Sequence, residues 1–273
     1  MGTLVCFHAH PDDEAIATGG VMAKAAAEGH RVVLVTATRG EHGEVAEGFL
    51  RPGEALWERR VAELAEATAI LGVARQEFLG YVDSGMIGTP ENDAADAFWQ
   101  ADVEKAAEQL AEILREEHAE ALTVYDDHGN YGHPDHIQVH RVGVRAAALA
   151  GTPRVFEATV NRDFIRARLT EAAASDGAEA ASAAELIEQG LAEMGSPAAL
   201  INTEVNVLPW LDQKRRALFA HASQVTESSF FATMPPDAFA SAFGQEWFIL
   251  RDAPAGWAGA DLMVPLQSTP EAK

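Results

Sequence analysis

Residues 3–14 read TLVCFHAHPDDE: an apolar run that ends in a histidine, a proline and three acidic residues. The run over 3–8 is short and rich in β-branched and aromatic residues, which predicts a buried strand. Residues 15–28 are rich in alanine and contain no proline, which predicts a helix. The polar residues between them therefore lie at the carboxyl end of a first strand, where open α/β sheets build their sites.

The acids in this turn, Asp12, Asp13 and Glu14, allow two interpretations. Three carboxylates at a few ångströms repel one another, so a metal ion is the natural group to neutralise them. Alternatively, they cap the following helix, whose dipole favours acids at its N-terminus. A second turn of the same kind, farther along the chain, favours the metal.

Strands and helices alternate through the first 160 residues. Apolar, β-rich runs predict the strands, and apolar residues at helical spacing predict the helices. This alternation indicates an α/β fold with a mostly parallel sheet and helices on both faces. The expected strands cover 32–36, 77–81, 121–125 and 155–158, and the expected helices cover 57–71, 103–117 and 137–150.

The rest of the chain has a looser pattern. Residues 171–194 consist mainly of Ala, Glu and Ser, which predicts surface helices, a flap over the site or partial disorder. Strands are expected over 200–207 and 247–250, with a helix over 211–222 between them. No linker divides the sequence, so we expect a single domain over residues 1–273.

The second turn, residues 126–136, reads DDHGNYGHPDH and follows the strand expected over 121–125. Because crossovers between parallel strands are right-handed, this turn should open on the same edge of the sheet as the first. Each turn contains a His-Pro-Asp triplet, at residues 10–12 and 133–135. Two such triplets, each at a strand-to-helix turn, predict a shared functional site.

His10, Asp13 and His136 are the candidate metal ligands. His10 and Asp13 are three residues apart at the start of a helix, so their side chains can converge. His136 comes from a different strand end that should face the same crevice. Two imidazoles and one carboxylate with an open fourth position form the ligand set of a catalytic zinc ion. Such an ion lowers the pKa of its bound water to roughly 7, and Asp12 is free to take a proton from that water.

His133, Asp135 and Tyr131 are candidates for the remaining catalytic steps. A carboxylate beside an imidazole raises its pKa and fixes its orientation, so Asp135 should favour a protonated His133. A protonated His133 could stabilise an oxyanion or protonate a leaving amine, and Tyr131 could add a neutral donor. Three further histidines are expected outside the ligand set, the first of them as a packed core residue: His8, His128 and His140.

The composition limits the partners. The chain has 42 acidic and 20 basic residues and a net charge of -22, so neither nucleic acid nor an anionic membrane surface is an expected partner. Cys6 is the only cysteine, which excludes an intrachain disulfide and fits a reducing compartment. The sequence shows no signal peptide and no apolar stretch long enough to span a bilayer, so we expect a cytoplasmic location. The basic cluster at 214–216 predicts a solvated helix face, with contact to an anionic substrate as the alternative.

His-Pro-Asp-Asp-Glu at 10–14 and His-Pro-Asp-His at 133–136 together resemble the motifs of the zinc-dependent N-deacetylases of the PIG-L/LmbE family. The resemblance covers roughly residues 3–160. It implies a Rossmann-like sheet with the zinc site at the C-terminal ends of the strands. Residues 161–273 lie beyond the resemblance, and we expect this part of the chain to shape the substrate pocket.

The resemblance also assigns roles to individual residues. It implies that zinc is held by His10, Asp13 and His136, and that Asp12 is the general base. His133, oriented by Asp135, would be the electrophilic and acid partner. These roles agree with those derived from the residues themselves. Iron could replace zinc in the cell.

Within the family, the loops at 40–45, 83–86 and 129–133 look most like the actinobacterial mycothiol branch. That branch holds the deacetylase of N-acetylglucosaminyl-inositol and the amidase of mycothiol S-conjugates. The amidase carries a lysine shortly after its first motif, where this chain has Ala15-Ile16-Ala17. This difference favours a deacetylase.

Three residues are candidates for substrate binding. In the deacetylase, an arginine and an aspartate that match Arg60 and Asp83 grip the sugar hydroxyls, with Arg59 as the alternative match for the arginine. Glu41, from the first of the loops named above, is the third candidate.

The sequence therefore predicts a metal-dependent amidohydrolase that removes an acetyl group from an N-acetylglucosamine-containing small molecule such as N-acetylglucosaminyl-inositol. Cleavage of mycothiol S-conjugates, or of another N-acyl amino sugar or secondary metabolite, is the alternative. A non-catalytic sugar or nucleotide-binding module is disfavoured because no Gly-x-Gly-x-x-Gly follows the first strand. A two-metal phosphoesterase would bind two magnesium or manganese ions instead of one zinc. The oligomeric state stays open.

Overall fold

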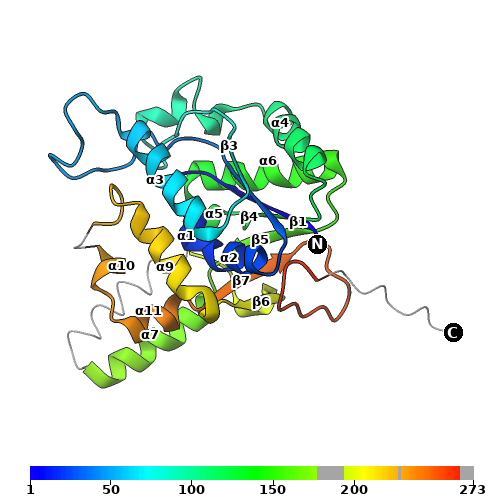
Figure 1. Ribbon diagram of the computed structural model, residues 1–273. Helices are drawn as coiled ribbons and strands as arrows, with labels where there is room; N and C mark the ends of the chain where they lie inside the picture. The colour runs from blue at the N-terminus through cyan, green and yellow to red at the C-terminus, as the bar shows by residue number, and fades with distance from the viewer. Residues whose placement is uncertain (177–193, 227–228, 265–273) are drawn as a thin grey trace.

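The computed structural model describes residues 1–176, 194–226 and 229–264, and it confirms the expected α/β class (Figure 1). A seven-stranded sheet has the order β3-β2-β1-β4-β5-β7-β6. Strands β1 to β5 run parallel, whereas β7 pairs antiparallel with both β5 and β6. The strands are β1 (Thr3–His8), β2 (Arg31–Thr36), β3 (Arg75–Phe78), β4 (Ala121–Tyr125), β5 (Val155–Thr159), β6 (Thr203–Asn206) and β7 (Gln245–Leu250).

Helices cover both faces of the sheet. In Figure 1, α4 and α6 lie over one face, and α2, α3 and α9 lie over the other. Short 3-10 turns occur at η1 (Pro90–Asp93), η2 (Phe98–Gln100), η3 (Ala198–Leu200) and η4 (Leu208–Trp210). The helices are α1 (Asp13–Ala17), α2 (Gly19–Ala27), α3 (Leu56–Leu71), α4 (Val103–Glu116), α5 (Gly129–Gly132), α6 (Pro134–Ala150), α7 (Arg162–Asp176), α9 (Leu211–Ala220), α10 (Phe230–Thr233) and α11 (Pro236–Phe243).

Strand β1 is buried on both faces, which explains its uninterrupted apolar sequence. Leu4 and Cys6 belong to the core beneath α2, α3 and α9, while Val5 and Phe7 belong to the core beneath α4 and α6. This alternation follows from the two-residue period of a strand. The central strand is thereby fixed from both sides, and the turn that follows it starts from a rigid position.

The helix expected over 15–28 is broken at Thr18, between α1 and α2. Thr18 adopts a non-helical backbone, and its Oγ1 lies 2.8 Å from Nε2 of His8. Helix α2 then begins on a distant carboxylate: Glu246 accepts hydrogen bonds from the backbone N–H groups of Gly20 (2.7 Å) and Val21 (2.8 Å). Acids at a helix N-terminus satisfy otherwise unpaired N–H groups.

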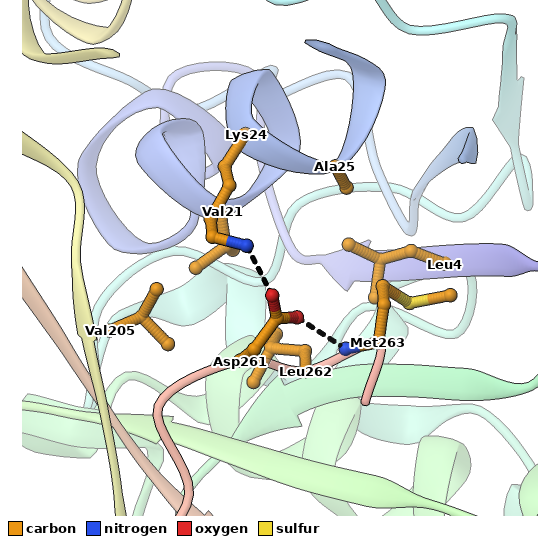
Figure 2. Close-up of a pocket in the computed structure, with 8 residues that line it drawn as sticks. All are labelled: Leu4, Val21, Lys24, Ala25, Val205, Asp261, Leu262 and Met263. Carbon is orange, nitrogen blue, oxygen red and sulfur yellow. Dashed lines mark hydrogen bonds and ion pairs between the residues drawn. The ribbon is translucent and has the colours of Figure 1, made fainter. Parts of the chain in front are cut away.

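Residues 251–264 form an irregular strap that packs against α2 and the sheet. Figure 2 shows Asp261 paired with Lys24 of α2, and its carboxylate accepts a hydrogen bond from the backbone N–H of Met263 (2.7 Å). Leu262 and Met263 line the same small cavity as Leu4 of β1. The strap therefore closes the apolar edge between β1 and α2.

Other boundaries differ modestly from expectation. The strand expected over 77–81 is β3 at Arg75–Phe78, and the one expected over 200–207 is β6 at Thr203–Asn206. The surface helices or flap expected over 171–194 lie largely outside the described residues, and only the end of α7 falls within that range. Among the described residues, none of the helices has the length and apolar character needed to cross a bilayer.

Lys214 is buried rather than solvated, so the expectation of a solvated basic face at 214–216 is wrong for this residue. Its Nζ lies 2.6 Å from Oε1 of Glu246, and both side chains are 2 % exposed. Since Glu246 also holds the start of α2, the ion pair links α9, β7 and α2. Helical periodicity could not reveal this, because Glu246 lies 32 positions away in the sequence.

We predict that Lys214→Ala lowers the free energy of unfolding by about 3–5 kcal/mol, because it leaves the Glu246 carboxylate buried without its partner. Arg216 serves as the matched control, since its side chain is 56 % exposed and pairs with Asp212 on the helix surface. Arg216→Ala should change the free energy by no more than about 0.5 kcal/mol. Urea unfolding measures both variants, and equal small losses would contradict the structural role of the pair.

Candidate active site

The two His-Pro-Asp turns meet, as the sequence predicts. Strands β1 and β4 are parallel neighbours in the sheet, so the turns at their carboxyl ends open on the same edge. The ring centroid of His10 lies 4.7 Å from that of His133 and 5.5 Å from that of His136. A histidine from the first turn and two from the second thus form one cluster.

Asp13 lies between two of these histidines. One of its carboxylate oxygens is 3.4 Å from Nδ1 of His10, and the other is 3.4 Å from Nε2 of His136. All three residues are buried. The three expected ligands are therefore together, and His133 joins them, because ligand atoms of His10, His133 and His136 all lie within 4.8 Å of one another.

These residues fit a divalent metal ion. His136 is 2 % exposed, and its Nδ1 has no hydrogen-bond partner in the part of the chain that the structure describes. Imidazoles together with a carboxylate are the donors that zinc and other first-row metals take. In addition, three acids surround His10: Asp13, Asp83 and Asp135. A cation would relieve the mutual repulsion of these buried carboxylates.

His10 turns its other nitrogen towards two of these acids. Its Nε2 donates to Oδ2 of Asp135 (3.1 Å) and lies 3.5 Å from Oδ1 of Asp83. Burial alone would disfavour the charged ring, but the carboxylates, led by Asp83, outweigh it and hold the pKa of His10 well above its usual value. The same ring holds the pKa of Asp83 far below its usual range, despite burial of the carboxyl group.

His133 differs from expectation in both its partner and its charge. Among the described residues, the Asp135 side chain forms its hydrogen bonds with His10 and Ser84; the backbone N–H of Asp135 donates to Nδ1 of His133 (3.1 Å), which caps the N-terminus of α6. Burial, reinforced by the neighbouring His10 and His136, lowers the pKa of His133 to about 4. The ring is therefore neutral near pH 7, and because Nδ1 accepts, its proton resides on Nε2.

The Asp135 side chain contacts His10 instead. Its side chain is fully buried and accepts hydrogen bonds from both the backbone N–H (2.9 Å) and the hydroxyl of Ser84. Ser84 follows Asp83 in the loop after β3, so Asp135 joins that loop to the second His-Pro-Asp turn. A carboxylate that holds an imidazole fixes its tautomer and orientation. Here the oriented imidazole is His10 and not His133.

Asp12 occupies a strained backbone conformation. Its φ of 112° lies in the region that favours glycine, which costs about 1–3 kcal/mol and persists only where the surroundings enforce it. Two groups do so: Arg60 donates to Oδ2 of Asp12 (3.2 Å) and to the carbonyl of Pro11 (2.5 Å), and Glu14 accepts from the N–H of Asp12 (2.9 Å). Burial raises the pKa of Asp12 to about 6, although Arg60 opposes the shift.

Tyr131 stands at the rim of the cluster, on the second turn. It is 45 % exposed, and its hydroxyl lies 3.5 Å from Nε2 of His136. Burial of the phenol and the nearby Asp13 raise its pKa, so the hydroxyl keeps its proton and can donate. Its neighbour Asn130 has a φ of 63°, which turns the chain sharply before α6 begins.

The substrate-binding candidates surround the first turn. Asp83 is 4 % exposed, and its backbone N–H donates to Oε2 of Glu41 (3.1 Å), which ties the two candidate residues together. Arg60 is 3 % exposed and also donates to the carbonyl of Gly40 (2.9 Å). The geometry thus gives Arg60 a role in holding Asp12, and its contact with a sugar stays a prediction. Arg59, the alternative match, points away and pairs with Glu54.

The three histidines that the sequence analysis expects outside the ligand set, His8, His128 and His140, lie apart from the ligand cluster. His8 is 1 % exposed, lies 2.9 Å from the hydroxyl of Tyr125, and has its pKa lowered to about 4 by burial. His140 contacts the backbone carbonyl of Tyr125 through Nδ1 (3.0 Å). His128 lies beside Asp127 and is partly exposed. Among the described residues, none of the three belongs to a group of side chains that could hold a metal ion, and the expectation that they are not ligands stays a prediction.

Sequence reasoning missed several supporting residues. Tyr125, the last residue of β4, stacks on His136 with ring centroids 4.1 Å apart, and only its position at a strand end hinted at this. Ser84 lies in a loop that was singled out, but a serine there carries no ligand signal. His221 and Glu14 form a buried pair with Nε2 and Oε1 2.7 Å apart, across 207 positions of sequence.

Comparison with known proteins places this arrangement in context. Residues 5–147 match the PIG-L family, described as GlcNAc-PI de-N-acetylase. A 1D-myo-inositol 2-acetamido-2-deoxy-alpha-D-glucopyranoside deacetylase of Thermomonospora curvata is 44 % identical over 276 residues, covering 93 % of this chain and 92 % of that protein. An enzyme of the same name from Acidothermus cellulolyticus is 39 % identical over 268 residues, covering 94 % and 91 %.

Among solved structures, an N,N'-diacetylchitobiose deacetylase from Pyrococcus horikoshii, complexed with its inhibitor MPG, has a similar fold. Its TM-score is 0.58 at 21 % sequence identity, and the match covers 91 % of this chain and 83 % of that one. At this identity the likeness concerns the fold.

We predict that His136→Ala reduces the bound metal by more than about tenfold, because it removes one of few ligands in a buried site. His140→Ala is the matched control, since His140 belongs to the same helix but faces the carbonyl of Tyr125. It should bind metal as the wild type does. Elemental analysis after dialysis against a defined metal concentration measures both, and full metal content in His136→Ala would contradict the assignment.

Proposed function

This chain belongs to the PIG-L family of de-N-acetylases, and we propose that it is a zinc-dependent hydrolase that removes the acetyl group from N-acetylglucosaminyl-inositol or a closely related glycoside. The general activity, hydrolysis of an amide C–N bond, is that of the family. The choice of substrate is supported by relatives that are 39–44 % identical over nearly the whole chain.

The observation that carries the proposal is the meeting of the two His-Pro-Asp turns around Asp13. It brings together three donors for a metal, His10, Asp13 and His136, with a carboxylate beside them that is not needed as a ligand, Asp12. A hydrolase of amides needs these two parts in contact: an electrophilic centre and a base. A simple binding module needs neither.

A zinc ion bound by His10, Asp13 and His136 would lower the pKa of a water molecule to about 7 and polarise the substrate carbonyl. Asp12 is placed to take the proton from that water at its carboxylate. The water oxygen adds to the acetyl carbon, the C–N bond then breaks as the amine nitrogen takes up the proton that Asp12 accepted, and acetate leaves.

His133 acts in this scheme as a neutral donor. With Nδ1 occupied by the N–H of Asp135, the Nε2–H is free to donate to the oxyanion that forms on the acetyl oxygen. The hydroxyl of Tyr131, at the open rim, can supply a second hydrogen bond to the same oxygen. Removal of one such donor in other hydrolases costs about 10²–10³ in kcat.

The sugar hydroxyls would lie against the loops after β2 and β3. Asp83 and Glu41 supply carboxylate acceptors there, and Arg60 donates to the carbonyl of Gly40, the residue before Glu41. Since Asp83 also approaches His10, a hydroxyl bound to it would stand next to the metal ligands. The sugar ring would then lie within reach of Asp12.

We predict that purified wild-type protein releases acetate from N-acetylglucosaminyl-inositol faster than from free N-acetylglucosamine or a mycothiol S-conjugate. Preference for the S-conjugate would make the chain an amidase of conjugates and overturn the proposed substrate. Acetate release and amine formation, measured together, show that the amide bond is the one cleaved.

Asp12→Asn should lower kcat by at least about 10²-fold while metal content stays unchanged, because the amide side chain keeps the shape of the turn but cannot take a proton. Near-normal turnover of this variant would contradict the role of Asp12 as base. Arg51→Ala, in the exposed loop before α3, is a control that should leave kcat unchanged.

Removal of the metal with a chelator should abolish turnover, and one equivalent of zinc per chain should restore it. A requirement for two equivalents would favour the two-metal phosphoesterase chemistry instead. Parallel titration with ferrous iron under anaerobic conditions tests whether iron supports the same reaction.

A further inference from the structure

Glu14 and His221 form a completely buried pair next to the first His-Pro-Asp turn. Both residues are 0 % exposed, and the Nε2–H of His221 donates to Oε1 of Glu14 at 2.7 Å. The other ring nitrogen, Nδ1, is buried and has no hydrogen-bond partner among the described residues. The bond to Glu14 is therefore the one polar contact of this imidazole that the described part of the chain provides.

The second carboxylate oxygen of Glu14 contacts Asp12, the proposed base. Oε2 accepts a hydrogen bond from the backbone N–H of Asp12 at 2.9 Å. That backbone has a φ of 112°, which an aspartate rarely adopts, so the conformation requires outside support. Arg60 supports the side-chain oxygen and the preceding carbonyl, and Glu14 supports the N–H.

His221 is itself held firmly in place. It follows the last residue of α9, and its carbonyl accepts hydrogen bonds from the N–H groups of Gln224 (2.9 Å) and Val225 (2.8 Å). Both the N–H and the hydroxyl of Ser223 donate to Glu63 of α3, at 2.9 and 2.6 Å. The turn after α9 is thus bound to α3, the helix that also supplies Arg60.

We propose that His221 is a positioning residue for Asp12, acting through Glu14. The turn after α9 fixes the position of His221, and His221 fixes the position of the Glu14 carboxylate. Glu14 in turn holds the backbone N–H of Asp12, so that the Asp12 side chain faces the reacting water. This inference rests on the proposed function, in which Asp12 is the base. It gives the C-terminal part of the chain a share in catalysis rather than in substrate binding alone.

A merely structural pair would behave differently. A buried ion pair that only stabilises the fold contributes to unfolding free energy, and its loss would lower activity in step with stability or metal content. A positioning role lowers kcat in folded, metal-loaded protein and leaves KM nearly unchanged, because substrate contacts are intact.

Two variants of equal chemistry separate these cases. His221→Gln places its amide N–H near the position of Nε2 and should still reach Glu14. His221→Asn is one methylene shorter, places its amide nearer the position of Nδ1, and should not. We expect His221→Asn to lower kcat by about tenfold to a hundredfold with KM within about twofold of the wild type, and His221→Gln to recover most of the loss.

Ser223→Ala is the matched control. It removes the hydroxyl bond to Glu63, but it leaves the backbone N–H bond of Ser223 to Glu63 (2.9 Å), which keeps the turn on α3, and the contact between His221 and Glu14. It should lower the melting temperature without lowering kcat. Equal kcat losses in His221→Asn, His221→Gln and Ser223→Ala, in proportion to stability, would overturn the proposal, as would wild-type kcat in His221→Asn.

The path through Glu14 has its own test. If His221 acts on Asp12 only through Glu14, the double variant Glu14→Ala/His221→Asn should be no slower than Glu14→Ala alone. Losses that multiply would overturn this path. Metal content, measured on each variant, should equal that of the wild type.

Failure of the proposed function would show itself separately, as a wild type that releases acetate from none of the substrates. The crystal structure of the His221→Asn protein then decides the inference: an Asp12 backbone that leaves its φ near 112° supports it, and an unmoved Asp12 overturns it.

Discussion

The concentration of buried negative charge around one imidazole is the constraint on which the site depends. Asp13, Asp83 and Asp135 approach His10 from three segments of the chain, and all of them are buried. Carboxylates at this spacing tolerate one another only when positive charge lies between them. In the structure, the protonated His10 ring, whose pKa is held above its usual value, supplies part of that charge. A divalent ion at the same place would supply more and would free the imidazole to act as its ligand, so the electrostatics of the site call for a metal.

The acids and histidines of the site are attached to neighbouring strands whose positions are fixed by the core. Strand β1 is buried on both faces, and β4 and β2 flank it in parallel, so the loops that carry the acids and histidines leave the sheet at one edge. Asp12, the proposed base, requires more than this edge. Asp12 keeps a strained backbone because groups from α3 and from the turn after α9 hold it, and α9 belongs to the far end of the sequence. The first His-Pro-Asp turn is therefore encoded by the N-terminal motif but stabilised by residues some 50 to 210 positions away.

A structural feature could be predicted from the sequence when the residues that interact in it lie close together along the chain. Apolar runs and the two His-Pro-Asp turns are local patterns, and they were sufficient to predict the α/β class, the first five strands and the meeting of His10, Asp13 and His136. The antiparallel direction of β7, the burial of Lys214 and the state of His133 depend on partners that no local pattern contains. His133 illustrates the point: the neighbouring Asp135 suggested a protonated ring, but its carboxylate turns to His10, and burial, reinforced by two other imidazoles, lowers the pKa of His133 and keeps the ring neutral.

The central claim is that one metal ion is held by His10, Asp13 and His136, with Asp12 beside it as the base. Anomalous diffraction from crystals of the zinc-loaded protein tests it most directly. The account predicts a single strong peak with zinc–nitrogen and zinc–oxygen distances of about 2.0–2.2 Å to these three residues and none to Asp12. A metal bound by His10, His133 and His136 with Asp13 excluded would contradict it, even though the spacing of those three rings would permit such a site.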